Sequence, residues 1–164
     1  MERTLVLLKP DAVKRGLMGK ILSRFEDAGL KVVGAKMVWV DTNLGKKHYD
    51  EIGKVGQRHG DIVLQSLLRF MTSGPVVAFC LEGVNVVENV RKMCGSTEPK
   101  AAAPGTIRGD YSHISYTQAD QLGKAIENIV HASGNVDEAK QEIALWFKPE
   151  ELHSYKTVHE VHVF

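Results

Sequence analysis

Short apolar runs and helically spaced apolar residues alternate along the chain. A run of apolar residues, or apolar residues alternating with polar ones, predicts a strand, whereas apolar residues three or four apart predict a helix. The sequence therefore predicts strands at 5–8, 31–40, 76–81 and 129–131. It predicts helices at 20–28, 48–52, 63–71, 85–93, 119–127 and 137–146, and then a short helical turn and an extended end from Lys148.

This alternation indicates one sheet with helices packed on it, although the pattern alone does not fix the strand order. Residues 95–110 break the periodicity with two prolines, three glycines and three consecutive alanines. Irregular loops of that length are usually functional or disordered. A further breaker, Pro10, follows the first strand, and we expect Asp11 to cap the segment after it.

Composition narrows the function classes. The 164 residues fit a single domain spanning 1–164, with 43% hydrophobic and 25% charged residues, which is ordinary for a globular protein. Lys and Arg number 21 against 20 Asp and Glu, so the formal charge is only +1. A general basic field for nucleic acid or anionic lipid is therefore excluded. Any recognition of phosphate must come from a few placed residues.

The cysteines and the first apolar run bear on location. Cys80 and Cys94 do not have metal-ligand spacing, and they suggest a reducing environment. The run at 5–8 is too short for a signal peptide or a membrane span. We expect a cytoplasmic protein without membrane association.

His131 is the most informative chemical candidate. Its segment, 128–133, places it between Asn128 and Ser133, and Glu142 follows on the next predicted helix. Neutral imidazole is available near physiological pH and can act as a nucleophile if a lone pair is free. A histidine at the end of an apolar run is more often structural, so the prediction depends on what surrounds it.

Isolated cations upstream supply those surroundings. Lys9 ends a buried strand, Arg91 lies on a predicted helix, and Arg108 lies in the irregular loop with Thr97. Each is individually more typical of a solvated surface. Together, three cations and a hydroxyl match an electrostatic clamp on a transferring phosphoryl group. Residues 16–20 lack P-loop spacing, and this argues against a standard P-loop or Gly-rich-loop kinase site.

Histidines near the end of the chain suggest a metal site only weakly. His153, His159 and His162 lie among valines that alternate irregularly with polar residues. A partly exposed terminal strand explains this pattern better than metal ligation. We therefore expect no metal ligands there.

With these residues identified, the chain resembles the nucleoside diphosphate kinase family almost from end to end. The most specific stretches are Pro-Gly-Thr-Ile-Arg-Gly-Asp at 104–110 and the histidine segment at 128–133. Further matching stretches lie at 2–5, 9–11, 48–49, 73–78, 82–87 and 142–147. The resemblance implies a ferredoxin-like α/β sandwich with an antiparallel four-stranded sheet. It also implies ping-pong transfer of the ATP γ-phosphate through a phosphohistidine on His131 to a nucleoside diphosphate.

The resemblance also implies roles for individual residues. Glu142 orients the imidazole, and Tyr49 and Ser133 support the catalytic group. Phosphates and sugar are held by Lys9, Arg91, Thr97, Arg108 and Asn128. Mg²⁺ is the implied cofactor, bound through the nucleotide phosphates with no direct protein ligand. The implied partners are ATP, nucleoside diphosphates and further copies of the chain, with a hexamer favoured by the long tail beyond Trp146 and no obligatory nucleic acid.

Three departures from the family pattern affect local geometry. Gly134 stands where the family usually has Asp. The family's base-stacking aromatic falls near Val63, in a region lengthened at about 53–62. Either Val63 and Leu67 hold the base by apolar contact, or another ring such as His59 does. Extra residues near 115–122 lengthen the segment before Asn128.

Two other function classes compete with this interpretation. One is a catalytically idle oligomeric module that binds nucleotide or nucleic acid on the same scaffold. The near-neutral charge and the intact set of candidate residues argue against it. The other is a phosphatase with a phosphohistidine intermediate. The chain contains an Arg-His-Gly string at 58–60, but the resemblance to the kinase family, carried by the segments at 104–110 and 128–133, disfavours this class.

Overall fold

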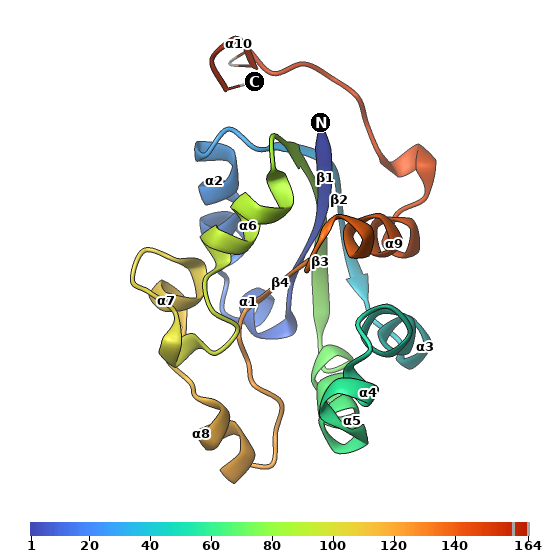
Figure 1. Cartoon of the computed structure of the whole chain (residues 1–164), viewed down its shortest axis with the longest axis vertical. Coiled ribbons are helices and arrows are strands. Elements are labelled where there is room, and N and C mark those ends of the chain that lie inside the picture. The colour runs from blue at the N-terminus through green and yellow to red at the C-terminus, as the bar shows by residue number, and fades with distance from the viewer. Residues whose placement is uncertain (159, 164) are drawn as a thin grey trace.

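The fold is a four-stranded antiparallel sheet covered by helices, seen in a computed structural model that describes residues 1–158 and 160–163 (Figure 1). The strand order is β2-β3-β1-β4, and all the paired neighbours are antiparallel. The strands are β1 (Glu2–Leu8), β2 (Lys31–Trp39), β3 (Pro75–Gly83) and β4 (Val130–Ala132). The predicted ferredoxin-like sandwich with an antiparallel sheet is thereby confirmed. Each predicted strand is present, with β4 beginning one residue later than expected.

The two central strands are apolar because helices cover both of their faces. β1 and β3 pair with Leu5 opposite Cys80 and Leu7 opposite Ala78. One core cluster joins Val6, Leu8 and Phe79 to helices on one face, and the other joins Leu5, Leu7 and Ala78 to helices on the opposite face. Figure 1 shows α2 and α6 on one side of the sheet and α9 on the other. A strand buried on both faces reads as a continuous apolar run.

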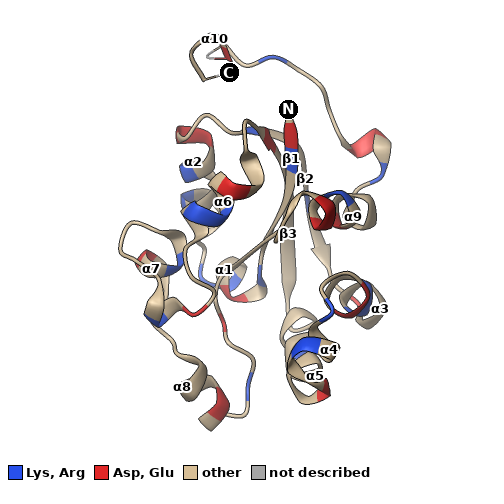
Figure 2. Cartoon of the chain, in the orientation of Figure 1, with Lys and Arg blue, Asp and Glu red and all other residues tan. Residues whose placement is uncertain are grey.

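The helices largely follow the predicted positions, with several additional short segments. The α-helices are α1 (Pro10–Lys14), α2 (Met18–Asp27), α3 (Thr42–Lys46), α4 (Val55–His59), α5 (Asp61–Met71), α6 (Val86–Cys94), α7 (Ile107–Tyr111), α8 (Tyr116–Gln121), α9 (Val136–Trp146) and α10 (Glu160–Val163). A π-helix covers Lys47–Ile52, and 3₁₀ turns cover Pro99–Ala101 and Pro149–Glu151. Figure 2 shows basic and acidic positions interspersed along these helices, in keeping with the balanced net charge.

Four local predictions were wrong. The helix expected at 119–127 ends at Gln121, because Gly123 adopts φ +62° and turns the chain. The loop at 95–110 includes a 3₁₀ turn and the beginning of α7. The terminal strand expected near the end of the chain is replaced by α10, and His159 lies outside the described residues.

Asp11 is the fourth of these local errors. It does not cap α1, whose N-cap is Lys9 without a side-chain cap bond. The Asp11 carboxylate instead accepts a hydrogen bond from the backbone N–H of Ile129.

Among residues 1–158 and 160–163, each helix is too short or too polar to cross a membrane.

Candidate active site

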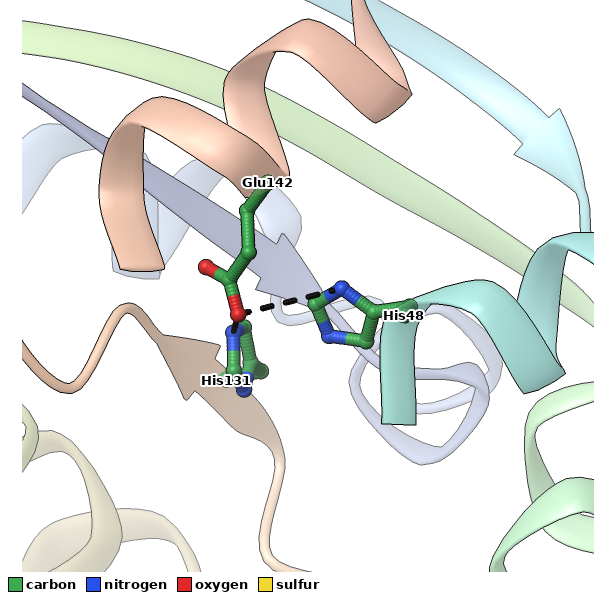
Figure 3. A group of neighbouring side chains, drawn as sticks. All are labelled: His48, His131 and Glu142. Atoms are coloured by element: carbon green, nitrogen blue, oxygen red, sulfur yellow. Dashed lines mark hydrogen bonds and ion pairs between the residues drawn. The ribbon is translucent and has the colours of Figure 1, made fainter. Parts of the chain in front are cut away.

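His131 lies on the short edge strand β4, opposite Leu7 of β1. Its side chain is 19% exposed, and its Nε2 lies 2.9 Å from Oε1 of Glu142. Glu142 projects from α9 and is 2% exposed (Figure 3). The sheet and α9 therefore bring together an accessible imidazole and a buried carboxylate that are 11 residues apart in sequence.

The second oxygen of Glu142 is also satisfied. Ser133 Oγ donates to Glu142 Oε2 over 2.6 Å, and the backbone N–H of Leu5 donates to Ser133 Oγ over 3.1 Å. Burial raises the pKa of Glu142, but electrostatic interaction with the His131 and His48 rings, together with hydrogen bonds from His131 and Ser133, brings that pKa below its ordinary value. The carboxylate is therefore ionised at neutral pH and acts only as an acceptor.

This hydrogen bond determines the tautomer of the neutral ring. Because the Glu142 carboxylate accepts, Nε2 of His131 must donate and carries the proton. The lone pair then lies on Nδ1, the nitrogen that does not face Glu142. In its neutral form the imidazole thus has one free, defined nucleophilic atom.

His48 is a second imidazole in the site, which the sequence analysis did not single out. Its ring lies 4.5 Å from that of His131, centroid to centroid, at 80° (Figure 3). Trp146 Nε1 donates to its Nδ1 over 3.2 Å, so the proton of His48 lies on Nε2. Burial lowers the pKa of His48 to about 3 and keeps it neutral. The sequence held one indication of a further polar partner near Glu142. Trp146 lies one turn later on the same helix face, and its indole N–H needs an acceptor.

The same three residues form the one His/Cys/Asp/Glu cluster with metal-ligand spacing in the described chain. The candidate ligand atoms of His48, His131 and Glu142 all lie within 4.8 Å of one another. Glu142 already accepts from His131, and His48 Nδ1 already accepts from Trp146. Hydrogen bonds therefore account for this cluster without a bound ion.

A cationic wall lies beside the imidazole. Lys9 is 6% exposed, and its Nζ donates to Asn128 Oδ1 over 2.6 Å. Burial and the nearby charge of Arg108 lower the pKa of Lys9 to about 8, which leaves it protonated at neutral pH. Arg108 is 7% exposed and donates to the backbone oxygens of Gly95, Asn128 and Val130. The side-chain amide of Asn128 holds Lys9 and backbone oxygens hold Arg108, and none of these uncharged acceptors neutralises the cation that it binds.

The remaining predicted phosphate-site residues lie around this wall. Asn128 Nδ2 donates to the backbone oxygen of Thr97 over 2.8 Å, which ties that loop to the site. Thr97 itself is exposed. Arg91 is exposed on α6, close enough for its charge to lower the pKa of Arg108. The structure therefore gathers most of the predicted polar residues at one end of β1.

Two buried donors in the site have no hydrogen-bond partner within the described residues. They are Tyr49 OH and His48 Nε2. The Tyr49 ring lies 6.1 Å from that of His131, centroid to centroid. A buried polar atom without a partner is costly, and a bound ligand that satisfies it is one explanation.

The departures from the family pattern take up defined positions. The lengthened region at 53–62 contains α4 and the first two residues of α5, and α5 is the helix that carries Val63 and Leu67. Val63 is 47% exposed, whereas Leu67 packs against the core cluster that contains Tyr49. The region at 115–122 contains α8. A Cβ on Gly134 would lie 2.5 Å from Glu138 Oε2, so glycine leaves space for that carboxylate.

His48→Gln will make folding stability less sensitive to acid. The ordinary histidine pKa of 6.5 falls to about 3 in the folded chain, so between these pH values the unfolded chain binds more protons. Stability is therefore lost as pH falls below 6.5, by up to about 1.4 kcal/mol per pH unit from this group. The free energy of unfolding, measured with urea between pH 4.5 and 7.0, should depend less steeply on pH in the variant than in the unaltered chain. Identical slopes would contradict the assignment of His48 as a buried neutral ring.

Comparisons with known proteins agree with this geometry. The family model described as "Nucleoside diphosphate kinase" matches residues 2–152. A Pyrococcus furiosus nucleoside diphosphate kinase is 50% identical over 155 residues, covering 94% of this chain and 88% of the relative. A Borrelia burgdorferi nucleoside-diphosphate kinase, solved as a transition-state mimic with vanadate and ADP, is 48% identical with a TM-score of 0.95 over 99% of this chain and 96% of that chain.

A halophilic nucleoside diphosphate kinase from Halobacterium salinarum, solved with CDP, is 38% identical with a TM-score of 0.84, covering 99% of this chain and 98% of that chain. The family match, the sequence identity and the shared structure extend over nearly the whole chain. The chain belongs to the nucleoside diphosphate kinase family.

Proposed function

We propose that this chain moves the γ-phosphoryl group of a nucleoside triphosphate, typically ATP, to a nucleoside diphosphate through a phosphohistidine on His131. The observation that carries the proposal is the 2.9 Å contact between His131 Nε2 and Glu142. It leaves Nδ1 as the nucleophile, which attacks the γ-phosphorus as the nucleoside diphosphate departs. A second diphosphate then takes the phosphoryl group from Nδ1, and the ring returns to its initial state.

The residues around the ring handle charge and position. Phosphoryl transfer needs positioning and charge stabilisation more than covalent help from the protein. Lys9 and Arg108 are held as buried cations, and Arg91 and Thr97 extend the phosphate-binding surface. Asn128 binds the sugar and phosphate region. The unpartnered hydroxyl of Tyr49 is available to a phosphoryl oxygen.

Val63 and Leu67 are proposed to hold the base by apolar contact. They lie one helical turn apart on α5, and both retain some exposure. Apolar contact recognises the face shared by all bases and discriminates weakly between them. A single site can then accept donor and acceptor nucleotides in turn.

Mg²⁺ is the proposed cofactor, and it would bind through nucleotide phosphates. The described residues fit this arrangement, because the one candidate ligand cluster has two imidazoles whereas Mg²⁺ prefers oxygen ligands. When bound, the ion would neutralise charge on the β- and γ-phosphate oxygens. Lys9 and Arg108 are the side chains placed to stabilise the rest of that charge.

The relatives support this chemistry over an idle binding module. The Borrelia burgdorferi structure contains vanadate and ADP as a transition-state mimic, and the Halobacterium salinarum structure contains CDP. Relatives about half identical to this chain are named as kinases, and the residues that the mechanism requires are present here. The alternative is therefore not favoured.

A homo-oligomer, with a hexamer favoured, is proposed as the working assembly. In the described sheet β2 pairs only with β3, so its other edge has free backbone groups. Met37 and Trp39 on this strand are 57% and 69% exposed. A second copy that covers this edge would bury both side chains.

We also propose a single domain over 1–164 and a cytoplasmic location. The free thiols of Cys80 and Cys94 are consistent with that location.

His131→Ala will abolish phosphoenzyme formation. With Mg²⁺ and γ-labelled ATP, the unaltered chain should acquire acid-labile, base-stable label and transfer it to GDP. The variant lacks the nucleophile, so transfer should fall by at least about 1,000-fold. His153→Ala, an exposed histidine elsewhere, is the matched control and should transfer normally. Transfer by His131→Ala at the unaltered rate would refute the proposal.

The double substitution Met37→Lys and Trp39→Lys will break the oligomer into smaller species. Two added charges on the β2 edge oppose its burial against another copy. Sedimentation velocity should show an oligomer for the unaltered chain and smaller particles for the double variant. Ile62→Lys, at a side chain 85% exposed on α5, is the control and should leave the oligomer intact. A monomeric unaltered chain would exclude the proposed assembly.

A further inference from the structure

A strained turn lies two residues before the catalytic histidine. Ile129 adopts φ +72°, whereas a β-branched residue normally avoids positive φ. The N–H of Val130 donates to the backbone oxygen of Asn128 over 2.8 Å, which closes a three-residue γ-turn around Ile129. A γ-turn with positive φ is rare and strained. Such a conformation persists only where surrounding contacts impose it.

Two residues at the end of β1 and the start of α1 supply those contacts. The Asp11 carboxylate accepts from the N–H of Ile129, with Oδ2 at 3.0 Å. The backbone N–H of Lys9 donates to the oxygen of Ile129 over 2.9 Å. Both polar groups of the strained residue are thus held by one short segment. Of these two contacts, only the one from Asp11 involves a side chain that substitution can remove.

The turn directs groups on either side of it into the site. Its first residue, Asn128, bonds to the Lys9 ammonium and to the Thr97 loop. Its last residue, Val130, begins β4, and His131 follows. Rotation at Ile129 would therefore move Asn128 relative to His131. A misplacement of about 1 Å in a reacting group can cost about 100-fold in rate.

The described contacts of the Asp11 side chain are few for a buried carboxylate. It is 8% exposed, and its Oδ1 has no hydrogen-bond partner within the described residues. Burying a carboxylate is costly unless its contacts compensate for the lost hydration. The charge of Lys9 and the hydrogen bonds from the backbone N–H groups of Ile129 and Ala12 are the compensating interactions, and only the bond from Ile129 reaches across to the turn.

We propose that Asp11 is a positioning residue of phosphoryl transfer, whose carboxylate holds Ile129 in its positive-φ turn and thereby sets the position of His131 against the nucleotide. This inference rests on the proposed function of His131. It assigns Asp11 an effect on the rate of His131 phosphorylation, with little effect on nucleotide binding.

The first test compares Asp11→Ala with Asp11→Asn. Single-turnover phosphorylation of His131 by Mg-ATP is measured at pH 6.5, where Lys9, with its pKa of about 8, stays protonated. Asp11→Ala removes the acceptor, so the rate at saturating ATP should fall by about 10- to 100-fold while the KM for ATP changes less than about threefold. Asp11→Asn retains an acceptor oxygen and should stay within about threefold of the unaltered rate. Equal losses in both variants would overturn the hydrogen-bond role.

The second test uses the strain itself. Glycine adopts positive φ without help, so in an Ile129→Gly background the additional loss caused by Asp11→Ala should shrink to less than about threefold. If the two substitutions instead act independently, Asp11 does not work through this turn. Should Ile129→Gly fail to fold, the comparison of alanine with asparagine at position 11 still decides the proposal.

A matched control separates positioning from general loss of stability. Val33→Ala truncates a buried side chain on β2, three strands away from β4 in the sheet order. It should lower the melting temperature while leaving the phosphorylation rate within about twofold of the unaltered value. If it slows phosphorylation as much as Asp11→Ala does, the effect is not specific to the turn. If Asp11→Ala reacts normally while His131→Ala takes up no label, this inference fails and the proposed function stands.

Discussion

The hydrogen bond between His131 and Glu142 is the constraint on which the site depends. It joins a partly exposed imidazole on β4 to the buried carboxylate of Glu142 on α9. A buried carboxylate is costly unless both oxygens are satisfied, and here Ser133 satisfies the second. The result is an ionised acceptor that keeps the ring proton on Nε2. Without it, the two ring nitrogens would compete for the proton, and the nucleophilic atom would be undefined.

The fold supplies this arrangement through β1. Its middle residue, Leu5, bonds to Ser133, and Leu7 near its C-terminal end pairs with His131. The strand then leads directly into Lys9. One buried strand therefore sets the distance between Ser133, which supports the carboxylate, the proposed nucleophile His131 and Lys9, the first cation proposed to bind phosphate. Because helices cover both faces of that strand, these distances are protected from local motion. This accounts for a site built largely from residues that the sheet already fixes.

The sequence predicted those parts of the molecule that depend on local pattern. Residues 5–8 and 76–81 were recognisable as strands because burial on both faces makes them continuously apolar. The antiparallel topology came from the family resemblance, since alternation of strands and helices does not encode strand order. The helix expected at 119–127 was too long because Gly123 ends it, and α10 replaced an expected strand where irregular valines gave no clear period. His48 was overlooked because its significance is entirely tertiary: it lies against His131 and Trp146 across the fold.

The central claim is the position of one proton, and it can be measured directly. Nitrogen-15 NMR of histidine-labelled protein at pH 7 reports which nitrogen of His131 carries hydrogen. The hydrogen bond to Glu142 predicts a single neutral tautomer with the proton on Nε2 and a bare Nδ1. A proton on Nδ1, or on both nitrogens, would contradict it, because Glu142 would then not leave a nucleophile facing the nucleotide.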